Sequence, residues 1–243
     1  MVSSDIPDMR TGFRLAEALA GAATALHAAE GPEQTMDTAV ALAREIVPGT
    51  AEAGITLIER GTRVRTGACT TEAVRAVDAA QRSGPQRPAA PYWEALWERP
   101  VVRREDTARD PATEAAAKLG LRSLLSLRLS SGYRRLSILN LYASGADAFD
   151  DRAVRIGRLL AAHVSVALDS ARVQEQLTEA MHTRDVIGQA TGVLMAKLDL
   201  DAREAFRRLV RASQQENVKV RDIAFRVVET IGGGNGERGS GID

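Results

Sequence analysis

The sequence predicts an α+β domain, with an antiparallel sheet flanked by helices, followed by a small all-α bundle of three helices that a long helix joins to it. Apolar residues recur at spacings of three and four near both ends of the chain, as in amphipathic helices. Between roughly residues 50 and 145, short β-rich runs lie beside turn sequences. These runs do not alternate regularly with helices, which disfavours a doubly wound parallel sheet.

Two helices are expected after a flexible N-terminus of residues 1–11. The first begins near Gly12 and carries apolar residues at spacings of four, three and four: Leu15, Leu19, Ala22 and Leu26. The sequence "EGPEQ" breaks it. The second repeats the same spacing and is ended by Pro48: Met36, Val40, Ala43 and Val47.

The sheet is expected from strands and hairpins in the middle of the chain. "AGITLIE" and "RVRTGAC" flank the turn "RGT" as one hairpin, and "LRSLLSLRLS" and "LSILNLYA" flank "SGYRR" as another. Leu125, Leu127 and Leu129 should face one side of the sheet, and Ser126 and Arg128 the other. "RPVVRRED" contains a further short strand. Helices are expected at residues 72–82, in "YWEALWE" and from Pro111 to Gly120.

A long helix should begin near Asp150 and Asp151, whose carboxylates suit the positive end of a helix. It is expected to run beyond residue 180, and residues 173–183 would form a helical linker. Such a helix can form a coiled-coil seam, here interrupted by His163, Ser170 and Gln174. Its expected apolar positions are Leu160, Val164, Ala167, Ala171, Val173, Leu177 and Ala180.

Three short amphipathic helices are expected at residues 184–198, 202–215 and 220–231. Asp201 can cap the second of them, with Glu204 three residues later. The tail of residues 232–243 is rich in glycine and should be disordered.

Composition excludes several classes of protein. Lys plus Arg and Asp plus Glu number 32 each, so no overall basic field indicates nucleic acid. Cys69 is the single cysteine, which rules out an intramolecular disulfide and suits a reducing compartment. The sequence has no apolar run long enough for a membrane span and no apolar signal core at its start. A cytoplasmic protein without membrane contact is expected.

No catalytic or metal-binding motif emerges. His27, His163 and His182 lie on separate stretches without other ligands at metal spacing. Residues 234–239 match G-x-G-x-x-G, but they neither follow a strand nor open a helix. No cofactor is evident, and we expect a protein that is not an enzyme.

Residues 12–172 resemble a GAF domain. The matching stretches are "WEALWERPVVRRED", "AKLGLRSLLSLRL", "LSILNLYA" and "AFDDRAVRIGRLLAAHVSVAL". GAF domains are small-molecule sensors or dimerisation modules, so the resemblance implies a ligand pocket between the sheet and its covering helices. The Asn-Lys-x-x-Phe signature of cyclic-nucleotide binders is absent, and "RPAAPYWEAL" stands where many relatives have Gly-Pro-Cys. Tyr92, Trp93 and Trp97 could line the pocket or form core.

Residues 184–231 resemble an ANTAR domain along their whole length. The matching residues are Ile187, Gln189, Ala190, Gly192, Leu194, Met195, Ala205, Phe206, Leu209, Ala212, Ser213, Asn217, Lys219, Arg221, Asp222, Ile223 and Ala224. The resemblance implies binding of paired stem-loops in nascent mRNA, which favours an antiterminated transcript. Thr191 stands where many relatives carry lysine.

The charges of this segment suit a reader of RNA shape. Nine basic and seven acidic residues leave only +2, less than a nonspecific binder would carry. Contact with unpaired loop bases needs fewer cations and a closer approach. A solvated helix face is the alternative interpretation of Arg203, Arg207, Arg208 and Arg211. The RNA-binding candidates are Gln189, Ala190, Thr191, Gly192, Met195, Lys197, Ser213, Asn217, Lys219 and Arg221.

Gly188 and Gly192 raise two interpretations. They could admit an RNA loop, or they could let the last helix pack closely on the first. We expect a GAF–ANTAR regulator that acts as a homodimer, in which a signal changes the geometry of the two long helices. A DNA-binding regulator with the same sensor is the alternative, although "VRDIAFRVVETI" is too apolar for a recognition helix. A GAF-type enzyme such as a sulfoxide reductase is disfavoured by the single cysteine.

Overall fold

A computed structural model describes residues 9–59, 63–81, 91–132 and 135–232, and the chain divides into two compact units between Val173 and Gln174. The expected disordered tail and the glycine motif at residues 234–239 lie outside the described residues, apart from Gly232. The first eight residues of the expected flexible N-terminus also lie outside them.

The first unit is built on a five-stranded antiparallel sheet. The strands are β1 (Glu52–Glu59), β2 (Arg63–Cys69), β3 (Val101–Arg104), β4 (Ser123–Gly132) and β5 (Arg135–Ala143). Their order is β2-β1-β5-β4-β3, and all neighbouring pairs are antiparallel. β1 and β5 meet in the centre and are buried along almost their whole length. The predicted antiparallel sheet is therefore confirmed.

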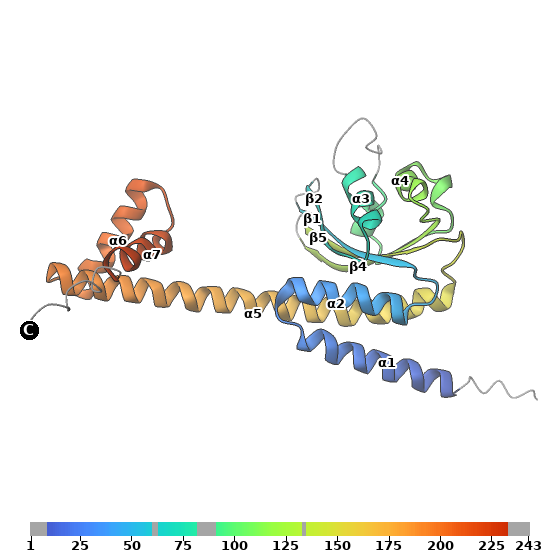
Figure 1. Ribbon diagram of the computed structural model, residues 1–243, viewed down its shortest axis with the longest axis horizontal. Helices are drawn as coiled ribbons and strands as arrows, with labels where there is room; N and C mark the ends of the chain where they lie inside the picture. The colour runs from blue at the N-terminus through green and yellow to red at the C-terminus, as the bar shows by residue number, and fades with distance from the viewer. Residues whose placement is uncertain (1–8, 60–62, 82–90, 133–134, 233–243) are drawn as a thin grey trace, which may run out of the picture. The chain divides into compact units, whose positions relative to one another are not determined.

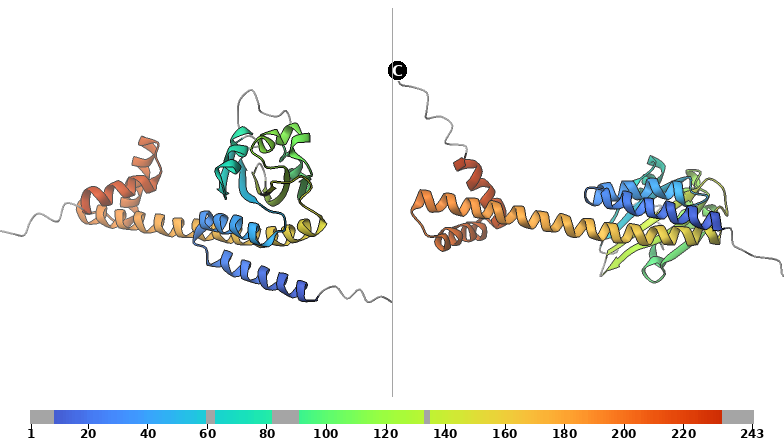
Figure 2. Two further views of the ribbon diagram at one scale, coloured as in Figure 1. Left: turned by 45° about the vertical axis from the view of Figure 1, so that its right-hand side comes forward. Right: turned by 90° about the horizontal axis from the view of Figure 1, so that it is seen from below.

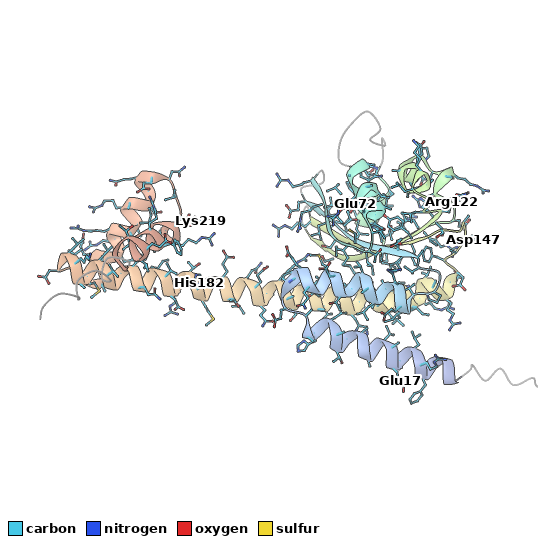
Figure 3. All side chains as sticks on the ribbon, in the orientation of Figure 1. Glu17, Glu72, Arg122, Asp147, His182 and Lys219 are labelled. Carbon is cyan, nitrogen blue, oxygen red and sulfur yellow. The ribbon has the colours of Figure 1, made fainter. Side chains whose placement is uncertain are left out.

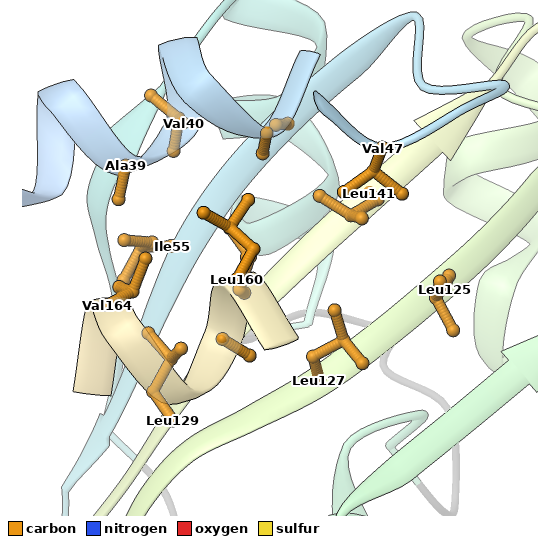
Figure 4. Packing of buried hydrophobic residues seen from close by; sticks show 14 of the residues in the cluster. Ala39, Val40, Val47, Ile55, Leu125, Leu127, Leu129, Leu141, Leu160 and Val164 are labelled. Carbon is orange, nitrogen blue, oxygen red and sulfur yellow. The ribbon is translucent and has the colours of Figure 1, made fainter. Parts of the chain in front are cut away.

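One face of the sheet is covered by helices from both ends of the unit (Figure 1). These are α2 (Gly31–Ile46) and the first part of α5 (Asp151–Leu198). α1 (Met9–Ala28) packs along α2, farther from the sheet (Figure 2). Leu125, Leu127 and Leu129 join this core, as their alternation predicted (Figure 4). Gly157 permits the close approach of α5, because a Cβ there would lie 2.9 Å from Leu127 Cδ1.

The opposite face carries shorter elements. They are α3 (Glu72–Ala80), α4 (Glu114–Lys118) and three 3₁₀ turns at Glu94–Trp97, Thr107–Arg109 and Pro111–Thr113. The helix expected in "YWEALWE" is thus only a single 3₁₀ turn, confined between Pro91 and Pro100. Arg128 extends to this face, as predicted, and its Nη1 donates to the carbonyls of Leu96 and Trp97 at 3.1 and 3.0 Å.

α5 is one continuous helix of 48 residues. Asp150 caps its start, since its Oδ1 accepts a hydrogen bond from Ala153 N at 2.7 Å. The separate helix expected at residues 184–198 is the last part of α5. The expected coiled-coil positions need correction, because Leu160 and Val164 are buried against the sheet. The apolar residues that α5 exposes before residue 185 are Leu159, Val166, Val173, Leu177 and Met181.

The second unit consists of the end of α5, α6 (Ala202–Glu216) and α7 (Val220–Gly232). Its core is small, and Ala190, Leu209, Ile223 and Ala224 form its buried centre. Asp201 caps α6 as predicted, with Oδ1 accepting from Glu204 N at 2.7 Å. Within the described ranges, no helix combines the length and the apolar character that a membrane crossing requires.

Candidate nucleic-acid interface and sensor core

In the second unit, α5 turns one face towards α6 and α7. Ala190 lies on that face and is fully buried with Leu209 and Ile223. Its side chain therefore serves the core, although the sequence suggested it as an RNA contact. Thr191 is half-buried, and its hydroxyl donates to the Ile187 carbonyl at 2.7 Å, a bond within its own helix.

The opposite face of α5 carries what we call the glycine strip, formed by Gly188, Gly192 and Met195, with the exposed Gln189 at its side. The spacings of four and three place these residues above one another on the helix. Apart from the adjoining residues and the backbone of the same helix, no heavy atom of the described chain lies within 4 Å of a Cβ built on either glycine. The interpretation that the pair lets the last helix pack closely on the first is therefore wrong.

Two further RNA-binding candidates, Ser213 and Asn217, form hydrogen bonds within the turn between α6 and α7. Asn217 ends α6 in the left-handed conformation, with φ of 53°, and its backbone N–H donates to the Ser213 carbonyl. The Ser213 hydroxyl donates to the Val218 carbonyl at 2.5 Å. These polar groups satisfy the free backbone groups at a helix end.

The cations of this unit divide into paired and unpaired side chains. Arg221 forms a hydrogen-bonded ion pair with Glu179, which raises the pKa of Arg221. Arg207 is also paired, because its Nη2 lies 2.6 Å from Glu204 Oε2. Lys197 and Lys219 are exposed, and Figure 3 marks Lys219 beside the turn. Among the described residues, the cations of this unit without a carboxylate within 4 Å are Arg184, Lys197, Arg203, Arg208, Arg211 and Lys219.

The exposed face of α6 carries Phe206, one of the residues that match the ANTAR pattern. Phe206 is 45% exposed, whereas Ala205 and Leu209 are buried. Arg203, at spacing three from Phe206, shares its exposed face. The exposure of Phe206 could have been predicted from the sequence. Ala205, Leu209 and Ala212 recur at helical spacing and form the apolar face of α6 without it.

In the first unit, the three candidate aromatic residues belong to the core below α3 and α4. Tyr92 and Trp93 are buried and Trp97 is half-buried. The Tyr92 hydroxyl accepts a hydrogen bond from Asn140 Nδ2 at 2.9 Å, and burial raises the pKa of Tyr92. Trp93 Nε1 has no hydrogen-bond partner in the described part of the chain.

Asn140 is the centre of a buried polar network that the sequence analysis did not identify. Its Nδ2 donates to Thr56 Oγ1 at 2.8 Å, and its Oδ1 accepts from Ser126 Oγ at 2.6 Å. Asp78 accepts from Thr56 and Thr66 at 2.8 and 2.7 Å. The network joins β1, β2, β4, β5 and α3, so it fixes their register in the core.

Nucleophilic and metal chemistry gain no support from the described residues. Cys69 is half-buried, and burial raises the pKa of its thiol, which disfavours the reactive thiolate. In the ranges that the structure covers, no group of three or more His, Cys, Asp or Glu side chains could hold a metal ion.

Solved structures share the fold of the first unit at low sequence identity. The phytochrome photosensory core module of Stigmatella aurantiaca has a TM-score of 0.58 and 11% identity over 84% of this chain and 45% of that one. The free methionine-R-sulfoxide reductase of Neisseria meningitidis has a TM-score of 0.51 and 16% identity over 72% of this chain and 96% of that one. The GAF domain of a phosphoenolpyruvate-protein phosphotransferase from Coxiella burnetii has a TM-score of 0.50 and 16% identity over 68% of this chain and 98% of that one.

The chain thus spans less than half of the phytochrome module, and these identities show a shared fold alone. No curated protein sequence matches the chain. Two protein-family models match the chain: the GAF domain at residues 29–169 and the ANTAR domain at residues 175–228. ANTAR domains bind RNA in general, and GAF domains often bind small ligands or dimerise. The chain belongs to the GAF-domain family and carries an ANTAR domain after it, the architecture of a GAF–ANTAR transcription regulator.

Proposed function

We propose that this protein is a signal-responsive transcription antitermination regulator, whose ANTAR unit binds paired stem-loops in nascent mRNA under the control of the GAF unit. It acts in the cytoplasm as a homodimer, so that two ANTAR units engage the two hairpins. The general support is the ANTAR match, since the family binds RNA.

The observation that carries the proposal is the open glycine strip. Each glycine inside a helix costs about 1 kcal/mol relative to alanine. No contact within the described chain requires Gly188 or Gly192. A partner that approaches the helix backbone explains the cost, and unpaired loop bases are such a partner.

The groups around the strip suit RNA. The Gln189 amide can hydrogen-bond base edges, Met195 offers an apolar surface for a base, and the exposed Lys197 is available to a phosphate. We therefore assign RNA contact to Gln189, Gly192, Met195, Lys197 and the exposed Lys219. Ser213 and Asn217 support the turn instead, and Arg221 pairs with Glu179 of α5.

A gel shift of the full chain with a paired-hairpin RNA tests the proposal. Gly192→Leu should weaken hairpin binding by about tenfold or more, because the side chain fills the approach to the backbone. The variant should fold, since the space around Gly192 is open. Gly192→Ala should raise stability by about 1 kcal/mol while it weakens binding less.

Ala202→Leu is the matched control, because Ala202 is also an exposed small residue of a helix in this unit. Light scattering should give the same mass for both variants as for the parent protein. Wild-type affinity of the folded Gly192→Leu variant would show that the strip is not the RNA surface. Duplex DNA that competes as well as hairpin RNA at fixed salt would instead indicate a DNA-binding regulator.

A further inference from the structure

A groove of about 420 Å³ lies in the first unit, where the ends of β1, β2, β4 and β5 meet α5. Leu57, Ile58 and Leu136 are buried residues of its lining. They belong to β1 and β5. The Leu57 side chain packs on the sheet face covered by α2 and α5, whereas Ile58 and Leu136 pack in the core of the opposite face. This volume is within the range of small-molecule sites.

Three guanidinium groups line the groove, one each from β2, β5 and α5. Arg65 stands opposite Leu57 in the sheet register, and Leu57 stands opposite Ser137 on its other side. Arg135 is two residues before Ser137, so its side chain emerges on the same face of the sheet. Arg172 reaches the same place from α5, and its Nη2 donates to Ser137 Oγ at 3.3 Å.

The acidic residues of the groove do not neutralise these groups. Glu59 and Asp169 leave a net charge of +1 against the three arginines. Arg172 Nη1 lies 3.6 Å from Asp169 Oδ1. Neither Arg65 nor Arg135 has a carboxylate within 4 Å among the residues described, although Glu59 stands opposite Arg135 in the register.

We propose that this groove binds a small organic molecule through a phosphate or carboxylate group. Arginine presents a planar fork of donors that matches either oxyanion in a bidentate manner. The Leu57 side chain offers an apolar contact to the organic part of the ligand. The groove uses the face of the sheet that carries Leu57 and Ser137, whereas Tyr92 and Asn140 lie in the core on the other face.

Calorimetric titration of the full chain with phenyl phosphate and with benzoate tests the assignment, at an ionic strength held constant with sodium chloride. At least one of them should bind saturably, and the one that binds identifies the oxyanion. Arg135→Gln should weaken that binding by about tenfold, since a charge-assisted hydrogen bond is lost. Glu59→Gln should strengthen it, because a competing carboxylate is removed.

Arg155→Gln is the matched control, because Arg155 is an exposed arginine of α5 that does not line the groove. Its affinity should equal that of the parent protein. The gain expected from Glu59→Gln cannot arise from misfolding, so it separates loss of the site from loss of the fold. The proposal is overturned if neither probe binds beyond the chloride control, if Arg155→Gln weakens binding as much as Arg135→Gln, or if Glu59→Gln brings no gain. None of these outcomes depends on RNA binding.

Discussion

Asn217 shows how a single residue of the ANTAR unit can match a family pattern for a structural reason. Its left-handed backbone ends α6, and it is one of three non-glycine residues with positive φ among those described. Asparagine tolerates this conformation better than most residues, and glycine adopts it without steric cost. The position therefore selects for backbone conformation before it selects for any contact with a base.

We predict that Asn217→Gly retains both stability and hairpin affinity. Asn217→Val should destabilise the second unit by about 1–2 kcal/mol, because a branched side chain is strained in this conformation. Urea unfolding and a gel shift measure the two quantities on the same samples. If Asn217→Gly keeps its stability but loses affinity, the amide contacts RNA after all.

At the scale of single elements, α5 is the segment with the most exposed apolar side chains. Val166, Val173 and Leu177 are 72%, 55% and 60% exposed. Their spacings of seven and four place them on one side of the helix, as in a coiled-coil seam. Leu160 and Val164 point instead into the core of the first unit, so the exposed residues are the ones available to a second copy.

If the proposed homodimer forms through this seam, Leu177→Glu should convert it to a monomer. Each leucine buried in a seam contributes about 1.5–3 kcal/mol, and the variant replaces two of them with carboxylates that repel each other. Thr178→Glu is the matched control, because Thr178 is the next exposed residue and its side chain points about 100° away around the helix. Light scattering that finds Leu177→Glu dimeric at the parent concentration would place the contact elsewhere.

The elements also show what the sequence could and could not predict. Alternation placed Leu125 and Leu127 on the correct face of β4, and the acidic residue Asp201 was correctly identified as a cap, because both signals are local. The pairing of β1 with β5 joins segments about 80 residues apart, and a local periodicity in the sequence cannot predict such a pairing. The sequence also could not predict that α5 continues through Gly188, because tertiary contacts decide whether a helix tolerates a glycine.

The site was predictable only in part for the same reason. Ser126 alternates with apolar residues as a solvent-facing position of a strand does, whereas Asn140 is a single polar residue between apolar ones. Only the helices on both faces of the sheet turn them into a buried network. Likewise, the family pattern contains both Ala190 and Gly192, but the packing of α6 and α7 decides which of them is open to a ligand.

At the scale of the whole molecule, the two units have hydrophobic cores of very different size. The first unit has a large apolar cluster on each face of its sheet, whereas the second depends on a few buried side chains around Leu209. Small units bury a smaller fraction of their surface and are correspondingly less stable. The ANTAR unit should therefore be the more easily unfolded of the two.

Leu209→Ala tests this asymmetry. Removal of a buried leucine costs about 2–5 kcal/mol, a large part of the stability of so small a unit, and hairpin binding should be lost. Both tryptophans of the chain, Trp93 and Trp97, lie in the first unit, so their fluorescence reports its unfolding alone. The tryptophan thermal midpoint of Leu209→Ala should remain at the parent value. Leu139→Ala, in the core of the first unit, should lower that midpoint by several degrees. Equal shifts in the two variants would mean that the continuous helix α5 makes both units unfold as one.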